Sequence, residues 1–280
     1  MKKILFTDMD GTLLLSNSTV SDEMKEALDR LHAAGHILVL SSGRPLDSIL
    51  EVAEAAGILP SNADSSADTG TGTLIISNNG SLVYDCSARR PVMEQTVPYE
   101  IASDIIAAAK RLGIHVQTYT DHEIVCEKDD EEVQFYRSRV HLPLITAEDE
   151  LSVLPHPPYK VHTIHLTDKS RLDTLKAEIE KMHGDTITAQ YSNDQYLEFF
   201  SRQSGKGNAL RWVCEHFDIP LENSYASGDA PNDISMLLAA GTGIAMANAD
   251  PEVKEIADVI TEKDNDHNGL IEIIEKYFPA

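Results

Sequence analysis

Short apolar runs of a strand's length alternate with amphipathic helical segments in the first part of the chain. Ile4–Thr7 and Ile37–Leu40 are two such runs. One helix is predicted to begin at Ser21, a capping hydroxyl followed by two acids, and a second to run from Pro45 to Ala56. Strands that alternate with helices pair in parallel through right-handed crossovers. The sequence therefore predicts an α/β fold built on a parallel sheet.

The middle of the chain has a different pattern. From about residue 83, strand-like alternation such as His115–Tyr119 mixes with longer amphipathic helices. After residue 200 the short strand-and-helix rhythm returns. We expect residues 1–82 and 201–280 to form one α/β core and residues 83–200 to form an α+β module inserted into it, since both sizes suit single domains.

Charge and composition narrow the classes of function. The 280 residues carry 46 acidic against 23 basic side chains, a formal net charge of −23, which repels nucleic acid and anionic membranes. No apolar run approaches the ~20 residues of a membrane span, and the N-terminus lacks the apolar stretch of a signal peptide. The three cysteines show no disulfide or zinc spacing. We expect a cytoplasmic protein without nucleic-acid or membrane partners, either monomer or dimer. Residues 61–73 are predicted to form a surface loop.

Acidic residues follow the predicted strands where catalytic groups are expected. Asp8 and Asp10 end the first strand, and two like charges this close need a cation or a proton between them. Further polar residues follow the other strands or begin the helix after the insert: Ser42, Gly43, Lys206, Asp229, Asn232 and Asp233. Open α/β sheets bind ligands beyond the carboxyl ends of their strands. Oxygen ligands beside a phosphate suit Mg²⁺, which is the cofactor we predict.

Four motifs in order carry a family resemblance. DMDGTLL, SSGR, SGKGNAL and GDAPNDISML resemble the haloacid dehalogenase superfamily, and within it the Cof-type phosphatases with a large C2-type cap inserted after the third strand. The later stretch MANADPEVKEIADVITEKDNDHNGL resembles the same family. The resemblance implies a Rossmann-like core with an inserted cap that supplies specificity. It also implies a Mg²⁺-dependent phosphatase that hydrolyses a small phosphomonoester, with a sugar phosphate as the first expectation.

The resemblance also implies roles for the acidic residues. Asp8 matches the nucleophile that becomes an aspartyl phosphate. Asp10 matches the acid/base that protonates the leaving alcohol and later activates water. Asp229 matches a magnesium ligand, joined by Asp8 and the backbone carbonyl of Asp10, with Asp233 nearby.

Phosphate binding is assigned by the same resemblance. Ser42 matches the phosphate-binding hydroxyl and Lys206 the lysine that neutralises the phosphoryl oxygens. The backbone N–H of Gly43 and the side chain of Asn232 are predicted to reach the phosphate. Ser41 is an alternative to Ser42, because the family usually has Ala-Thr where this chain has Ser-Ser.

Two residues keep alternative interpretations. Arg44 either faces the substrate or balances nearby acids. Asn79, in Asn-Asn-Gly, either contacts the substrate, as the family often has it, or serves the turn that Asn-Gly favours.

Two other functions use similar residues. A phosphomutase or phosphotransferase passes the phosphoryl group to another hydroxyl, and release of inorganic phosphate argues against it. A non-enzymatic phospho-acceptor switch also combines acids, Mg²⁺, a hydroxyl and a lysine, but it needs neither Asp10 as an acid nor a long insert.

Overall fold

The structure, a computed structural model, describes residues 2–59, 72–140 and 142–279. The loop predicted at 61–73 lies outside these residues except for Gly72 and Thr73. Contacts divide the chain into two compact units: a core unit of Met1–Arg44, Ile49–Met93 and Gly205–Ala280, and an insert unit of Pro45–Ser48 and Glu94–Ser204.

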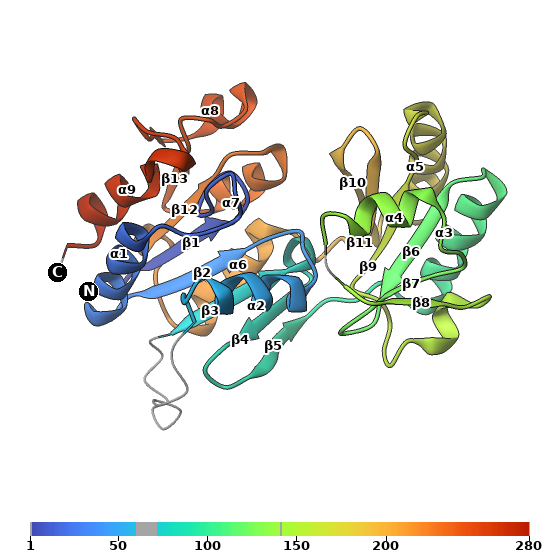
Figure 1. Cartoon of the computed structure of the whole chain (residues 1–280), viewed down its shortest axis with the longest axis horizontal. Coiled ribbons are helices and arrows are strands. Elements are labelled where there is room, and N and C mark those ends of the chain that lie inside the picture. The colour runs from blue at the N-terminus through green and yellow to red at the C-terminus, as the bar shows by residue number, and fades with distance from the viewer. Residues whose placement is uncertain (1, 60–71, 141, 280) are drawn as a thin grey trace. The chain divides into compact units, whose positions relative to one another are not determined.

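The core unit contains an eight-stranded sheet with the order β14-β13-β12-β1-β2-β3-β4-β5 (Figure 1). The strands from β14 to β3 pair in parallel, and β4 turns back antiparallel to β3. This arrangement confirms the predicted α/β class with a parallel-sheet core. The bounds are β1 (Ile4–Asp8), β2 (Ile37–Ser41), β3 (Thr73–Ser77), β4 (Leu82–Asp85), β5 (Arg90–Glu94), β12 (Ser224–Gly228), β13 (Thr242–Ala245) and β14 (Val259–Ile260).

The strands β1, β2, β3 and β12 are buried at every position. A strand buried on both faces has no polar alternation, which explains the continuous apolar runs in the sequence. β5 is largely exposed and carries no such run. The predicted change of pattern at residue 83 falls inside β4, whereas the division by contacts falls between Met93 and Glu94.

Helices and short 3-10 turns connect the core strands. The Ser21 hydroxyl accepts a hydrogen bond from the Met24 N–H and caps α1, as the sequence predicts, and α9 packs beside α1 (Figure 1). The helices are α1 (Asp22–Ala33), α2 (Leu46–Ala55), α6 (Lys206–His216), α7 (Ile234–Ala239), α8 (Pro251–Ile256) and α9 (Gly269–Tyr277); the 3-10 turns are η2 (Asn78–Gly80), η4 (Leu221–Asn223), η5 (Pro231–Asp233) and η6 (Asn265–His267).

The insert unit is built on a six-stranded, mostly antiparallel sheet with the order β10-β11-β9-β6-β7-β8. One apolar cluster joins this sheet to α3 and α5, and another joins it to α4. The strands are β6 (His115–Tyr119), β7 (Ile124–Cys126), β8 (Leu144–Thr146), β9 (Lys160–Ile164), β10 (Ile187–Asn193) and β11 (Tyr196–Ser201); the helices are α3 (Tyr99–Arg111), α4 (Glu131–Arg137), α5 (Lys169–His183) and the 3-10 turn η3 (Glu150–Val153).

A buried ion pair crosses the centre of the insert sheet. Lys160 Nζ on β9 lies 2.6 Å from Glu198 Oε1 on β11, and both side chains are almost fully buried. Each charge of this buried pair depends on partners within the protein, because water is not available to replace a partner that is removed.

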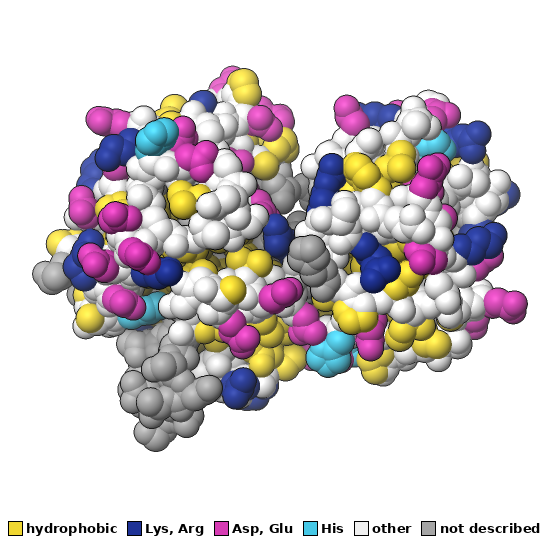
Figure 2. All heavy atoms as spheres, viewed as in Figure 1, with side chains coloured by type: hydrophobic (Ala, Val, Ile, Leu, Met, Phe, Trp, Pro, Cys, Tyr) yellow, Lys and Arg dark blue, Asp and Glu magenta, His cyan; other side chains and the backbone are white. Residues whose placement is uncertain are grey.

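Acidic side chains are distributed over the visible surface, with Lys and Arg among them, so the net negative charge does not form one patch on that face (Figure 2). Among the described segments, none of the helices has both the length and the apolar composition needed to cross a bilayer.

Candidate active site

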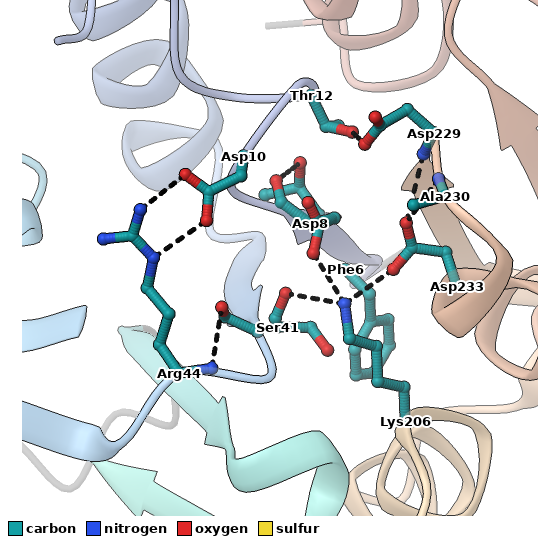
Figure 3. Close-up of polar contacts among 12 residues, drawn as sticks. Phe6, Asp8, Asp10, Thr12, Ser41, Arg44, Lys206, Asp229, Ala230 and Asp233 are labelled. Atoms are coloured by element: carbon teal, nitrogen blue, oxygen red, sulfur yellow. Dashed lines mark hydrogen bonds and ion pairs between the residues drawn. The ribbon is translucent and has the colours of Figure 1, made fainter. Parts of the chain in front are cut away.

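The polar residues that follow the core strands converge at one edge of the sheet. β12, β1 and β2 are neighbours in the sheet and run in parallel, so their carboxyl ends lie together. Asp8 ends β1, and Asp229 directly follows β12. Lys206 begins α6 and reaches the same place (Figure 3). The fold therefore brings together side chains separated by more than two hundred positions in the sequence.

Lys206 is the centre of this cluster. Its buried Nζ lies 2.6 Å from Asp8 Oδ1 and 2.6 Å from Asp233 Oδ1, and it donates to the Ser41 carbonyl at 3.2 Å. A cation at a helix N-terminus opposes the helix dipole, and here two carboxylates compensate for that cost. Burial alone would lower the pKa of Lys206, but the Asp233 and Asp8 charges outweigh it and raise this pKa.

The carboxylates are crowded enough to disfavour full ionisation. Burial and the Asp233 charge raise the pKa of Asp8 well above its usual range, against the opposing charge of Lys206. Burial, and then Asp233, raise the pKa of Asp229 to about 6. Carboxyl oxygens of Asp8, Asp229 and Asp233 lie within 4.8 Å of one another. This all-oxygen donor set, with more negative charge than Lys206 neutralises, fits a hard divalent cation such as Mg²⁺.

Asp233 differs from the other two acids in its contacts. Its Oδ1 binds Lys206, and its Oδ2 accepts hydrogen bonds from the backbone N–H groups of Asp229 and Ala230, both at 3.1 Å. Both oxygens are therefore already used by the protein. Asp233 fixes the turn that carries Asp229 and holds Lys206 beside Asp8.

Asp229 is also fixed from the β1 side. The Thr12 hydroxyl donates to Asp229 Oδ1 at 3.0 Å, and the Asn248 amide donates to the Gly11 carbonyl at 2.8 Å. Neither side-chain contact was predicted from the sequence. Thr12 stands in the DMDGTLL motif and Asn248 in MANAD, so both were within quoted motifs, but a motif does not reveal a partner more than two hundred residues away.

Asp10 lies apart from the Lys206 cluster. β1 ends at Asp8, and the following turn directs the Asp10 side chain toward Arg44 (Figure 3). The Arg44 guanidinium donates to both Asp10 carboxylate oxygens, from Nε at 2.8 Å and from the terminal nitrogen at 2.7 Å. Of the two interpretations of Arg44, this contact corresponds to the one in which it balances an acid.

The loop after β2 supplies the predicted phosphate-binding groups. The Ser42 hydroxyl accepts a hydrogen bond from the Arg44 N–H at 3.2 Å. The Ser41 hydroxyl is buried, and no partner for it is found in the described part of the chain. A Cβ at Gly43 would lie 2.8 Å from Asn79 Oδ1, so the Asn79 side chain packs closely against the loop at this glycine.

Asn232 is half-buried on η5. Among the residues described, its side chain forms no hydrogen bond or ion pair with the other predicted site residues. Its position in the turn between Asp229 and Asp233 places it at the same sheet edge.

Comparisons with known proteins identify the family. A family model described as haloacid dehalogenase-like hydrolase matches residues 5–274. Phosphatase YwpJ of Bacillus subtilis is 28% identical over 95% of this chain and 96% of its own length. The 5-amino-6-(5-phospho-D-ribitylamino)uracil phosphatase YwtE of the same organism is 27% identical over 98% of this chain and 97% of its own.

A solved structure agrees with these relatives. A haloacid dehalogenase-like hydrolase from Bacteroides thetaiotaomicron superposes with a TM-score of 0.86 at 29% identity, covering 99% of this chain and 100% of that one. The match thus includes both units of the chain, and the predicted class of enzyme agrees with it. This chain belongs to the haloacid dehalogenase-like hydrolase family.

Proposed function

We propose that the protein is a Mg²⁺-dependent phosphatase that hydrolyses a small phosphomonoester through an aspartyl phosphate on Asp8. The observation that carries the proposal is the buried ammonium of Lys206, held at 2.6 Å from both Asp8 and Asp233. A buried lysine between carboxylates keeps Asp8 oriented and offers its charge to an incoming phosphoryl group. The names of the relatives, which are phosphatases, support the same reaction class.

The chemical step divides between two aspartates. Asp8 attacks phosphorus, so an Asp8 oxygen–phosphorus bond forms as the bond from phosphorus to the leaving oxygen breaks. Asp10 gives a proton to that leaving oxygen and then takes one from the water that hydrolyses the aspartyl phosphate. Lys206 neutralises charge on Asp8 and on the phosphoryl oxygens. Ser42 and the Gly43 N–H bind the remaining oxygens.

The metal would be held by Asp8, Asp229 and the backbone carbonyl of Asp10. When bound, Mg²⁺ offsets the charge of the acids and of the phosphate, which lets an anionic nucleophile approach an anionic substrate. Asp233 holds Lys206 and the Asp229 turn in place. Asn232, in the same turn, contacts the phosphate.

A small polar metabolite is the substrate class that we propose, with sugar phosphates as the first members to test. The relative YwtE is named for a phosphorylated ribitylamino compound, which is a sugar-alcohol phosphate ester. We assign the choice among such substrates to the insert unit, the specificity domain that the family resemblance implies.

Release of inorganic phosphate from a panel of sugar phosphates, nucleotides and phosphorylated cofactors tests the proposal. We expect turnover with Mg²⁺, reversible loss with EDTA, and no turnover by Asp8→Asn. Asp29→Asn, which removes an exposed carboxylate from α1, is the matched control and should retain full activity. Full activity of Asp8→Asn would reject the proposal. Transfer of phosphate to a second sugar would indicate a phosphomutase or phosphotransferase, and a phosphoprotein stable for minutes would indicate a phospho-acceptor switch.

A further inference from the structure

The ion pair between Arg44 and Asp10 is a contact at this site that the proposed reaction does not yet use. Both guanidinium–carboxylate hydrogen bonds are short, at 2.8 and 2.7 Å. The Asp10 side chain is 51% exposed and the Arg44 side chain 21%. An exposed ion pair adds little stability. A two-point pair nevertheless fixes the plane and the direction of a carboxylate, which a single contact does not.

Arg44 is itself fixed at its backbone. Its N–H donates to the Ser42 hydroxyl at 3.2 Å, and its carbonyl accepts from the Asn78 N–H at 3.0 Å. Ser42 follows β2, and Asn78 follows β3. The guanidinium is therefore presented from a loop that is tied to the ends of two neighbouring strands.

Asp10 depends on this partner for its direction. It lies on the turn after β1, where its side chain is half exposed and points away from Lys206 (Figure 3). The acids around Lys206 carry more negative charge than this lysine neutralises, so the cluster repels the Asp10 carboxylate and does not fix it. The guanidinium holds it on the opposite side of Asp8, and a general acid needs a fixed position relative to the leaving oxygen.

We infer that Arg44 is a positioning residue for Asp10, holding its carboxylate where it exchanges protons with the leaving group and with water. The inference rests on the proposed function, because it takes the acid/base role of Asp10 as given. It assigns Arg44 a role through Asp10 in place of a direct contact with the substrate.

Steady-state kinetics on two esters test the inference in the full-length protein with Mg²⁺. An alkyl phosphate needs a proton on its leaving oxygen, whereas p-nitrophenyl phosphate needs almost none. We expect Arg44→Gln to lower kcat for the alkyl ester roughly 10–100-fold, with kcat for the nitrophenyl ester changed less than about 3-fold. KM should change little. Arg44→Lys, which keeps the charge but not the two-point geometry, should recover part of the loss.

Three further variants make the result decisive. Asp10→Asn should show the same dependence on the leaving group, and Arg44→Gln combined with Asp10→Asn should be no slower than Asp10→Asn alone, because both act on one step. Arg30→Gln, an exposed arginine on α1, should match the unmodified protein. Thermal unfolding of each variant separates a folding defect from a kinetic one.

The possible failures are distinguishable. If Asp10→Asn slows both esters equally, the acid role in the proposed function is wrong and the inference falls with it. In the other case, the loss of kcat caused by Asp10→Asn depends on the leaving group, but Arg44→Gln slows both esters equally, raises only KM, or adds its full effect to that of Asp10→Asn. The proposed function then stands, and the role of Arg44 is overturned.

Discussion

Replacing Asp229 with Asn should stabilise the metal-free protein at neutral pH. Burial and the neighbouring Asp233 raise the pKa of Asp229 from 3.8 to about 6. The folded state therefore binds this proton more tightly than the unfolded state does. By linkage, the stability that protonated Asp229 contributes is fully present below its pKa in the unfolded state. This stability is lost as the pH rises toward its pKa in the folded state. The destabilisation by the ionised Asp229 grows between pH 3.8 and about pH 6 and has its full size above that range.

The size of the effect follows from the shift. A change of about two pKa units corresponds to about 3 kcal/mol at 1.36 kcal/mol per unit. Asp229 is partly exposed, and solvent screening reduces this figure to about 1–2 kcal/mol. Asn retains an oxygen for the Thr12 hydroxyl, which lies 3.0 Å from Asp229 Oδ1, so the substitution removes charge without removing that hydrogen bond.

Urea unfolding in EDTA at pH 8 measures this prediction. Asp229→Asn should raise the free energy of unfolding by about 1–2 kcal/mol at pH 8 and by about half as much at pH 5, where much of the folded protein already carries the proton. Mg²⁺ should stabilise the unmodified protein more than the variant, because a ligand stabilises the state that binds it. Asp29→Asn controls for the net charge. A variant less stable than the unmodified protein at pH 8 in EDTA would refute the reasoning about crowded carboxylates.

Two other substitutions test the packing around the site and in the insert unit. Gly207→Ala should lower the free energy of unfolding in urea by about 1–3 kcal/mol, because the new Cβ would lie 2.2 Å from the Ser235 carbonyl oxygen and push α6 away from α7. An unchanged free energy of unfolding would mean that the two helices adjust freely. Lys160→Met should cost about 3–5 kcal/mol because it removes the buried cation beside Glu198, and adding Glu198→Gln should recover part of this loss. If Glu198→Gln recovers no stability, the lost packing of Lys160 causes the destabilisation, and the charge of the buried Glu198 carboxylate does not.

The parallel core could be predicted because its signals are local. β1 and β2 are runs of apolar residues that end at polar ones, and α1 carries its own cap at Ser21. β4 and β5 could not be assigned in the same way. β4 takes its place by pairing with β3, and β5 lies beyond β4 at the edge of the sheet. The exposed β5 also lacks the apolar run of a central strand.

The candidate site was predictable as a set of residues and not as a set of contacts. Asp8, Lys206 and Asp229 stand at strand or helix ends, and the fold rule for parallel sheets places such residues together. The contacts between the site residues could not be predicted in this way. Arg44 follows a serine-glycine loop in the sequence, and only the arrangement of two neighbouring strand ends brings its guanidinium to Asp10.

The turn at Asn78–Gly80 links these groups through its backbone. All three residues have positive φ angles, of 49°, 55° and 88°, a conformation that favours Asn and Gly. The N–H groups of Asn78 and Asn79 donate to the carbonyls of Arg44 and Ser42, and a Cβ at Gly80 would lie 2.4 Å from the backbone of Gly205, just before Lys206. One strained turn thus contacts both the loop that holds Ser42 and Arg44 and the start of the lysine helix. The Asn-Asn-Gly sequence is therefore explained both by the turn that it forms and by its place at the site. The unusual backbone conformation lets this single segment contact both sides of the site.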